Sequence, residues 1–205
     1  MGNALILGSA SPRRQQLLRS IGLDFTVHAA DVDESCLPGE SPTDYVSRVA
    51  IAKAIAVVHL RGLGAADATA VLTADTTVDV DGEILAKPLD DDDARRMLAL
   101  MSGRTHQVHT AVVGWCPGGT HAVTVTTDVT FARLSDTDIE WYVSMGEHLD
   151  KAGAYGMQTA GGALVDRIDG SPSNVIGLPL VETIEILRAC GVDLTASDAA
   201  TSDNA

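Results

Sequence analysis

Aromatic residues are scarce in this chain of 205 residues, which has only 2 Trp, 3 Tyr and 2 Phe. Its core must therefore be filled by Leu, Ile, Val and Ala, and the hydrophobic share of 45% is large enough for one domain or two closely joined lobes. Long hydrophobic runs are also missing, because no stretch of about eighteen apolar residues occurs. The N-terminus carries no signal-type segment. We therefore expect no membrane partner.

Positive charge is in short supply as well. The chain has 14 Lys and Arg against 28 Asp and Glu, which gives a formal net charge of -14. Such a chain repels polyanions on average, so we expect no duplex nucleic acid among its partners. The few Lys and Arg residues are therefore more informative about function than they would be in a basic protein. If Arg13, Lys53 and Lys87 share one cleft, we expect that cleft to bind an anion.

Cysteine is rare and odd in number, with only Cys36, Cys116 and Cys190. Their positions share no metal-type spacing, so we expect buried structural thiols without a disulfide framework, in a reducing compartment. His106 and His109 do not predict a zinc site either, because residues three apart on a strand point to opposite faces. These observations together predict a cytoplasmic protein.

Strand and helix patterns alternate along the chain and predict an α/β fold. The run of four acids at 90–93 suits the first turn of a helix, where acids meet the helix dipole favourably, better than a cation site. The segment 195–205 is small, polar and acidic, and we expect it to be disordered. Strands are predicted at 4–7, 25–27, 71–73, 76–78, 83–85, 107–115, 122–131 and 163–168, and helices at 12–21, 41–60, 90–101, 135–144 and 179–189.

The strongest local signal lies in the first fourteen residues, where the apolar run 4–7 breaks into the segment GSASPRR. Ser11 is placed to cap a helix and Pro12 to occupy its first position, where a missing N–H costs nothing. Backbone donors, serine hydroxyls and a guanidinium would then converge at the carboxyl end of a strand, which favours a bound anion. The alternative is that Ser-Pro only starts a helix and that Arg13 and Arg14 face water.

Asp75 stands among apolar and hydroxyl residues, at what we expect to be the end of a strand. A partly desolvated acid needs a partner, and a metal ion or a bound water would serve in general-base catalysis, whereas a hydrogen-bonded turn aspartate is the alternative. Lys53, Lys87 and Glu34 each resemble ordinary surface charges. Combined, these acids and cations would suit a divalent metal and phosphate oxygens. No serine lies in a nucleophile-elbow pattern, which favours attack by water.

Eight short blocks of the sequence carry a family resemblance. They are SASPRR at 9–14, the acid pair at 33–34, Lys53 between two alanines, ADT at 74–76, Lys87-Pro88, SGRTH at 102–106, DKAGAYGMQ at 150–158 and the segment 170–179. In this order they resemble the blocks of Maf proteins, which are nucleotide pyrophosphatases once named septum-formation inhibitors. The resemblance covers about residues 4–194.

This resemblance implies an enzyme that hydrolyses a nucleoside triphosphate to the monophosphate and pyrophosphate by metal-assisted attack of water. It assigns Asp75 as the proton acceptor for that water. A divalent cation, Mg²⁺ or Mn²⁺, is implied as cofactor, with Glu34 and Asp75 as its ligands. The residues that match the triphosphate-contacting set are Ser9, Arg13, Lys53 and Lys87.

The resemblance also implies the fold and the assembly. We expect a mixed twisted sheet flanked by helices, with two lobes around a nucleotide-binding cleft, usually in a homodimer. Residues 1–194 are expected to form this single Maf-like domain.

The segment 150–158 is similar to that of the subgroup that prefers dTTP and UTP, in which the residues matching Arg13, Thr76 and Gln158 bear on base choice. A glutamine amide can pair with both the carbonyl and the N–H of uracil or thymine. Thr73 stands where the family usually has glycine, and Thr159-Ala160 replaces Gly-Leu, from which we expect altered loop stiffness. Two alternatives stay open: a pyrophosphatase for another nucleotide such as 7-methyl-GTP, and a nucleotide-binding regulator of cell division or septum formation.

Overall fold

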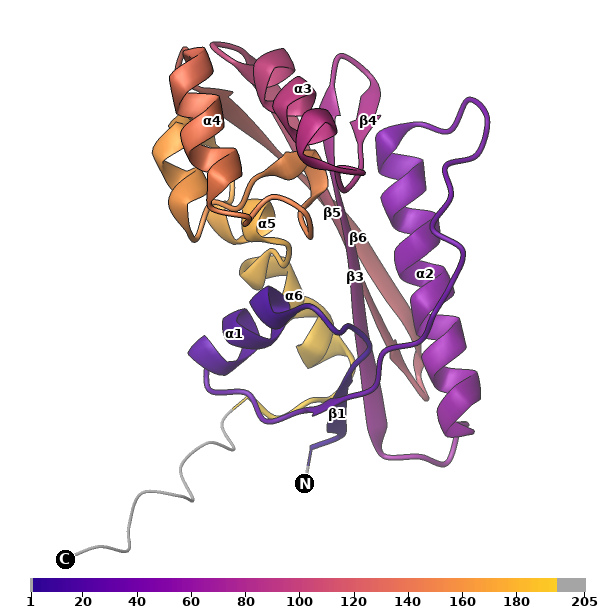
Figure 1. Ribbon diagram of the computed structural model, residues 1–205. Coiled ribbons are helices and arrows are strands. Elements are labelled where there is room, and N and C mark those ends of the chain that lie inside the picture. Colours follow the sequence, from indigo (N-terminus) through magenta and orange to yellow (C-terminus); the bar gives the residue numbers. More distant parts are fainter. Residues whose placement is uncertain (1, 195–205) are drawn as a thin grey trace, which may run out of the picture.

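A mixed sheet of seven strands runs through the computed structural model, which describes residues 2–194 (Figure 1). Its spatial order is β2 (Thr26–Val27), β1 (Ala4–Leu7), β3 (Thr69–Val80), β5 (Thr105–Cys116), β6 (Gly119–Phe131) and β7 (Val165–Asp169). β4 (Glu83–Leu85) pairs with the far end of β3. β1 is parallel to both of its neighbours, and the other pairings are antiparallel, so the expected mixed sheet is confirmed.

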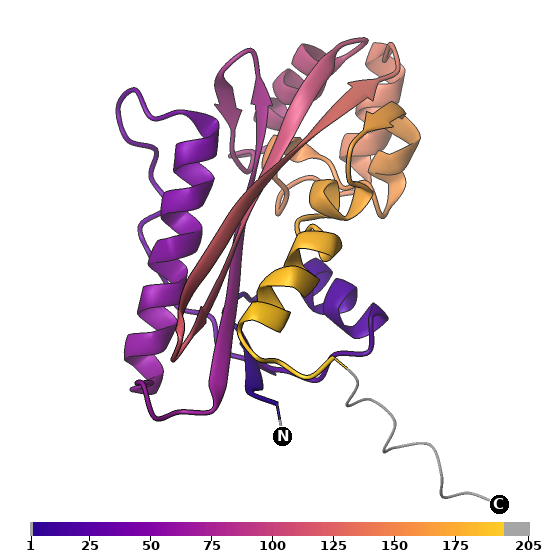
Figure 2. The ribbon, with the colours of Figure 1, turned by 180° about the vertical axis from the view of Figure 1, so that it is seen from behind.

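Helix α2 (Pro42–Arg61) lies alone on one face of the sheet, as both ribbon views show (Figures 1 and 2). Ser41 caps its first turn by accepting a hydrogen bond from the Asp44 N–H at 3.2 Å. Its buried face packs on Ala111 and Val113 of β5. The other face carries α1 (Pro12–Ser20), α3 (Asp91–Met101), α4 (Asp136–Ser144), α5 (Pro172–Ile176), α6 (Leu180–Ala189) and the 3-10 turns η1 (Ala152–Ala154) and η2 (Ala160–Leu164).

Two separate hydrophobic cores cover this second face, one at each end of β3. Near its start, Leu5, Leu18 and Leu187 bring β1, α1 and α6 together. Beyond its middle, the side chains of α3 and α4 pack with the far ends of the strands, as Leu98 and Tyr142 illustrate. The two lobes that the sequence predicts are therefore present, and they meet along the middle of β3.

One edge of β3 is only partly paired. β1 pairs with it from Thr69 to Leu72, and β4 pairs with it from Val78 to Val80. Within residues 2–194, no strand lies against that edge over residues 73–77. The sheet therefore has a gap between β1 and β4 at the junction of the two lobes.

Most of the expected elements are confirmed, but β3 differs from the prediction. It is one continuous strand of 12 residues, so Asp75 lies at its middle and not at a strand end. Thr73 likewise lies within the strand and not in a loop; it is fully buried, and its hydroxyl donates to the Ala50 carbonyl at 2.8 Å. The expected strand at 163–168 begins only at Val165, because the residues before it form η2.

The remaining expectations concern cysteines, acids and the chain end. The cysteines are all free, but Cys36 is exposed, so the prediction of buried thiols is wrong for this residue. The acids at 90–93 start α3 as expected, with Asp90 as the cap. No helix of residues 2–194 has the length and apolar character needed to cross a membrane. The segment 195–205 lies outside the described residues, and the domain boundary at 194 stays a prediction.

Candidate active site

A cavity of about 640 Å³ opens at the gap in the sheet edge, between the two lobes. Its walls come from the loop after β1, the middle of β3, α2, the end of β4 and the segment around 150–158. All of the candidate residues that the sequence singled out line this cleft: Ser9, Arg13, Glu34, Lys53, Asp75, Thr76, Lys87 and Gln158. The sequence therefore identified the members of one site, although their individual roles stay predictions.

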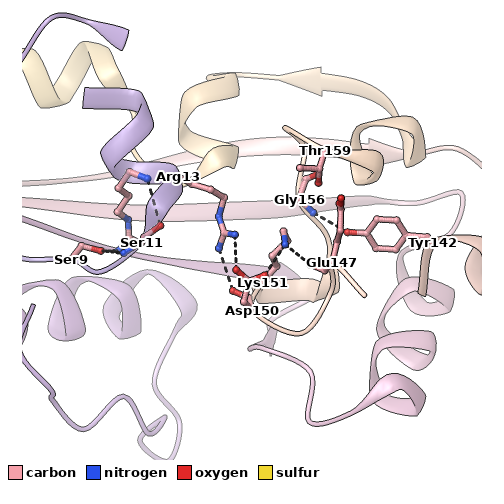
Figure 3. Close-up of polar contacts among 10 residues, drawn as sticks. Ser9, Ser11, Arg13, Tyr142, Glu147, Asp150, Lys151, Gly156 and Thr159 are labelled. Carbon is pink, nitrogen blue, oxygen red and sulfur yellow. Dashed lines mark hydrogen bonds and ion pairs between the residues drawn. The ribbon is translucent and has the colours of Figure 1, made fainter. Parts of the chain in front are cut away.

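The loop between β1 and α1 forms as the sequence predicts (Figure 3). Ser11 caps α1 with its side chain, and Pro12 takes the first helical position. The Ser9 hydroxyl accepts a hydrogen bond from the Ser11 N–H at 3.3 Å, which folds the loop tightly at the carboxyl end of β1. Gly8 is required just before it, because a Cβ there would lie 2.6 Å from Thr73 Cγ2.

Arg14 is the site residue that the sequence reasoning missed. Its guanidinium is buried and donates to Ser9 Oγ at 3.0 Å, Thr76 Oγ1 at 3.0 Å and the Gly177 carbonyl at 2.9 Å. Burial lowers the pKa of Arg14, and the Asp75 carboxylate opposes this effect. A signal was available, because Arg14 precedes the apolar Leu17 by one helical turn and so shares its buried face.

Arg13 reaches across the cleft to the opposite lobe (Figure 3). Its Nη1 lies 3.0 Å from Asp150 Oδ2, and its Nη2 donates to the Asp150 carbonyl at 3.2 Å. Lys151 holds the other carboxylate oxygen at 2.6 Å. Although partial burial raises the pKa of Asp150, the hydrogen bonds from Lys151 and Arg13 outweigh it, and the net pKa is lowered. The carboxylate is therefore held charged between two cations.

Lys53 lies at the centre of the site, between two carboxylates. Its Nζ is 2.7 Å from Asp75 Oδ1 and 2.8 Å from Glu34 Oε1. The Asp75 and Lys53 side chains are only 8% and 12% exposed, whereas that of Glu34 is 47% exposed. Burial raises the pKa of Asp75, while the positive charges of Lys53 and Arg14 act against that rise. The hypothesis that Asp75 is a turn aspartate is therefore wrong, because it lies in a strand and pairs with a lysine.

The segment 150–158 forms the far wall of the cleft. Gly153 has φ 66°, and a Cβ there would lie 2.8 Å from Val78 Cγ2, so only glycine allows this close approach to β3. Tyr155 packs edge-on against Phe131 and His106 in the core behind the wall. These buried contacts anchor the segment, while Gln158 is exposed at the cleft.

Glu34 and Asp75 provide a donor set that suits a hard divalent cation. Each carboxylate engages Lys53 through one oxygen, which leaves its second oxygen for another ligand. Mg²⁺ is typically held by one or two carboxylates together with water and substrate phosphates. The residues present therefore fit a metal that shares its coordination shell with a bound polyphosphate.

Comparison with known proteins identifies the chain's relatives. A family model described as Maf-like protein matches residues 4–190. A protein of Anaeromyxobacter dehalogenans named dTTP/UTP pyrophosphatase is 50% identical over 198 residues, which cover 95% of this chain and 97% of the relative. A protein of the same name from Methylobacillus flagellatus is 51% identical over 188 residues, covering 92% and 93% of the two chains. A third, from Hahella chejuensis, is 44% identical over 190 residues, covering 93% and 94%.

Proposed function

Because the chain belongs to the family of Maf-like proteins, we propose that it is a nucleoside triphosphate pyrophosphatase that acts on dTTP, UTP and modified pyrimidine triphosphates. The observation that carries this proposal is the position of Asp75, which is buried, bonded to Lys53 and open to a cleft lined by further cations. The names of the relatives at 50% and 51% identity support the choice of substrate.

In the proposed reaction, water hydrolyses the anhydride bond between the α and β phosphates. Asp75 accepts a proton from the attacking water, and the products are the monophosphate and pyrophosphate. The raised pKa of Asp75 makes it a stronger base than an exposed aspartate, and Lys53 keeps it ionised. No serine or cysteine nucleophile is needed.

The cations of the cleft would hold the triphosphate. Lys87 is exposed and lines the cleft opposite the loop after β1, so its ammonium is available to phosphate oxygens. Arg13 would join it by leaving Asp150. A divalent cation held by Glu34 and Asp75, Mg²⁺ or Mn²⁺, would neutralise further phosphate charge.

Base preference would come from the exposed lip of the cleft. The Gln158 amide offers one donor and one acceptor, which match the edge of uracil or thymine. The Thr76 hydroxyl is already engaged by Arg14 and by Thr110, each at 3.0 Å, so its role would be to position Arg14 and not to read the base directly.

The cellular setting belongs to the same proposal. The free cysteines support a location in the cytoplasm. The net charge of -14 supports a protein that binds nucleoside triphosphate in a local cationic cleft and does not bind duplex nucleic acid. A homodimer is proposed from the family resemblance.

The test is to incubate the purified protein with a panel of nucleoside triphosphates and Mg²⁺ and to identify the phosphate product. We expect pyrophosphate, with dTTP and UTP as the preferred substrates. Preference for 7-methyl-GTP would change the proposed substrate but leave the proposed reaction unchanged. Nucleotide binding without turnover would favour a regulator of cell division, and orthophosphate as the sole product would overturn the reaction class.

A further inference from the structure

Two cysteines and a histidine, which are residue types that can bind metals, converge outside the active-site cleft, although nothing in their sequence spacing predicts it. Cys116 ends β5, His121 lies near the start of β6, and Cys190 follows the last turn of α6. The ligand atoms of these residues all lie within 4.8 Å of one another. The two thiols are buried, at 5% and 2% exposure, whereas His121 is partly exposed.

The strand register explains this convergence. Gly114 pairs directly with His121 across the β5–β6 hairpin, and Cys116 is two residues further along β5. Because side chains alternate along a strand, Gly114, Cys116 and His121 all point to the same face of the sheet. That face is the one that α6 covers.

Gly114 brings α6 close enough for Cys190 to complete the group. A Cβ at Gly114 would lie 2.3 Å from Ile186 Cγ2 and 3.1 Å from Cys190 Sγ, so no larger residue allows the helix to approach this closely. The backbone of Cys190 is fixed in turn, because its carbonyl accepts a hydrogen bond from the Asn3 side chain at 2.8 Å. Cys190 is thus held over Cys116 by contacts on both sides.

Two thiols and one imidazole form a ligand set for a borderline-soft cation. Zn²⁺ binds Cys sulfur at about 2.3 Å and His nitrogen at about 2.0–2.1 Å in tetrahedral geometry. Such ligands lie about 3.5–3.8 Å apart in a tetrahedron, so movements of about 1 Å would close this group around the ion. The partly exposed side chain of His121 has more room for such a movement than the two buried thiols. The oxygen ligands of the cleft, by contrast, suit Mg²⁺.

We propose that Cys116, His121 and Cys190 form a Zn²⁺ site separate from the active-site cleft, with water as the fourth ligand. A second cavity of about 420 Å³, lined by Cys116 and Cys190 among others, adjoins the group and gives that water a place. The bound ion would connect the tip of the β5–β6 hairpin to the end of α6, both in the lower half of Figure 2. It would therefore stabilise the fold without taking part in hydrolysis.

The experiment measures metal binding by the full chain, first stripped with a chelator under reducing conditions and then dialysed against Zn²⁺ with excess Mg²⁺ to occupy the cleft. We expect one Zn²⁺ per chain. Cys116→Ser, Cys190→Ser and His121→Gln should each weaken binding at least about tenfold, since each removes a protein ligand. Cys36→Ser is the matched control, because this thiol is exposed and outside the group, and it should bind like the parent.

Co²⁺ in place of Zn²⁺ distinguishes thiolate ligands from carboxylates. The parent and Cys36→Ser should show a thiolate-to-cobalt charge-transfer band, which both Cys116→Ser and Cys190→Ser should weaken or lose. The variant His121→Gln should fold and hydrolyse nucleotide like the parent while binding Zn²⁺ more weakly. Absence of the charge-transfer band in the reduced parent, or Zn²⁺ binding by His121→Gln equal to the parent's, would overturn the site. Failure of the proposed pyrophosphatase activity would leave these measurements unaffected.

Discussion

At the scale of single residues, the site depends on Asp75, whose charge is subject to opposing influences. Burial favours its neutral form, and the cations Lys53 and Arg14 favour its ionised form. The net result is a raised pKa, which improves a base as long as the working pH stays above it.

Asp75→Asn tests this role, because the amide keeps the shape of the side chain but cannot take up a proton. We expect the turnover rate to fall at least about a hundredfold while directly measured nucleotide binding is largely kept. Asp79→Asn is the control on the same strand, since Asp79 only bonds the turn at Gly82 and His109 outside the cleft. A rate within a few-fold of the parent would remove Asp75 from the mechanism, and parallel loss of binding would make it chiefly a metal ligand.

The pH profile gives a second test at this scale. Because the pKa of Asp75 is raised above 3.8, the acidic limb of kcat/KM should lie at a higher pH than for an ordinary aspartate, with activity rising as Asp75 loses its proton. Lys53→Met removes a positive charge that lowers this pKa, so the limb should move further up in pH. An unchanged limb in this variant would show that another group titrates.

The cations at the mouth of the cleft give a third test. Arg13→Ala and Lys87→Ala should each reduce turnover by roughly tenfold to a thousandfold, the loss expected for a donor that stabilises phosphate charge. Arg19→Ala is the matched control, because Arg19 lies on the same helix but is exposed, and its guanidinium contacts Gln15 and the Phe25 ring outside the cleft. If Arg13→Ala behaves like this control, Arg13 serves only its ion pair with Asp150.

At the scale of elements, the site depends on how closely β1, β3 and α2 approach one another at Gly8. Gly8→Ala would place a methyl group 2.6 Å from Thr73 Cγ2 and 3.1 Å from Val57 Cγ2, so we expect a loss of stability of about 1–3 kcal/mol in chemical denaturation. Thr73→Ser removes the first clash and keeps the hydroxyl that bonds Ala50. Stability of the double variant should therefore exceed the additive value, whereas strict additivity would show that the close contact is relieved elsewhere.

Elements with strong local signals were predictable from the sequence, and those set by pairing were not. Ser11-Pro12 and Ser41-Pro42 mark helix starts through capping chemistry. Asp81-Gly82 is a dipeptide typical of tight hairpin turns, and here it has φ values of 54° and 88°. Helix α5, with only 5 residues, is too short to show a helical period. The gap along the edge of β3 depends on where β1 and β4 stop pairing, which no local pattern specifies.

The residues of the candidate site were also predictable only in part. Its members were found through motifs that resemble a family, and all of them line the cleft. Arg14 was missed because a charged residue in a first helical turn usually faces water, whereas here Ser9, Thr76 and Gly177 together satisfy its donors. The meeting of Cys116 with Cys190 needed the strand register and the position of α6, neither of which follows from spacing along the chain.

At the scale of the whole molecule, the free energy of unfolding should depend on pH, because His106 is buried in the core beside Tyr155. Burial lowers the pKa of His106 from 6.5 to about 4, so the folded protein stays unprotonated at this residue where the unfolded chain takes up a proton. Stability is then fully present above pH 6.5 and is lost as pH falls from there toward 4. The loss should be at most about 1.4 kcal/mol for each pH unit in this range.

His106→Gln removes this titration and keeps a polar group near the Tyr155 hydroxyl, which His106 Nε2 contacts at 2.9 Å. The difference in melting temperature between pH 7 and pH 5 should be smaller in the variant than in the parent, whatever its absolute stability. His28→Gln serves as the control, because that histidine is partly exposed and lies outside both this core and the Cys116, His121 and Cys190 group. Equal pH dependence in all three proteins would contradict the prediction.

If Arg13 binds phosphate as proposed, its ion pair with Asp150 would make ligand entry an exchange of counter-ions. The guanidinium already faces an anion, so an arriving phosphate replaces a carboxylate and does not meet a bare charge. Asp150 keeps its ion pair with Lys151 after Arg13 leaves it, which lowers the free-energy cost of breaking the Arg13–Asp150 pair. The ligand competes with the Asp150 carboxylate for Arg13, and its electrostatic attraction to the guanidinium grows with its negative charge. A ligand with several negative charges therefore displaces the carboxylate more readily than a ligand with one. In the proposed reaction a triphosphate would therefore displace Asp150 from Arg13 more readily than the monophosphate product would, and this difference would favour release of the monophosphate after hydrolysis.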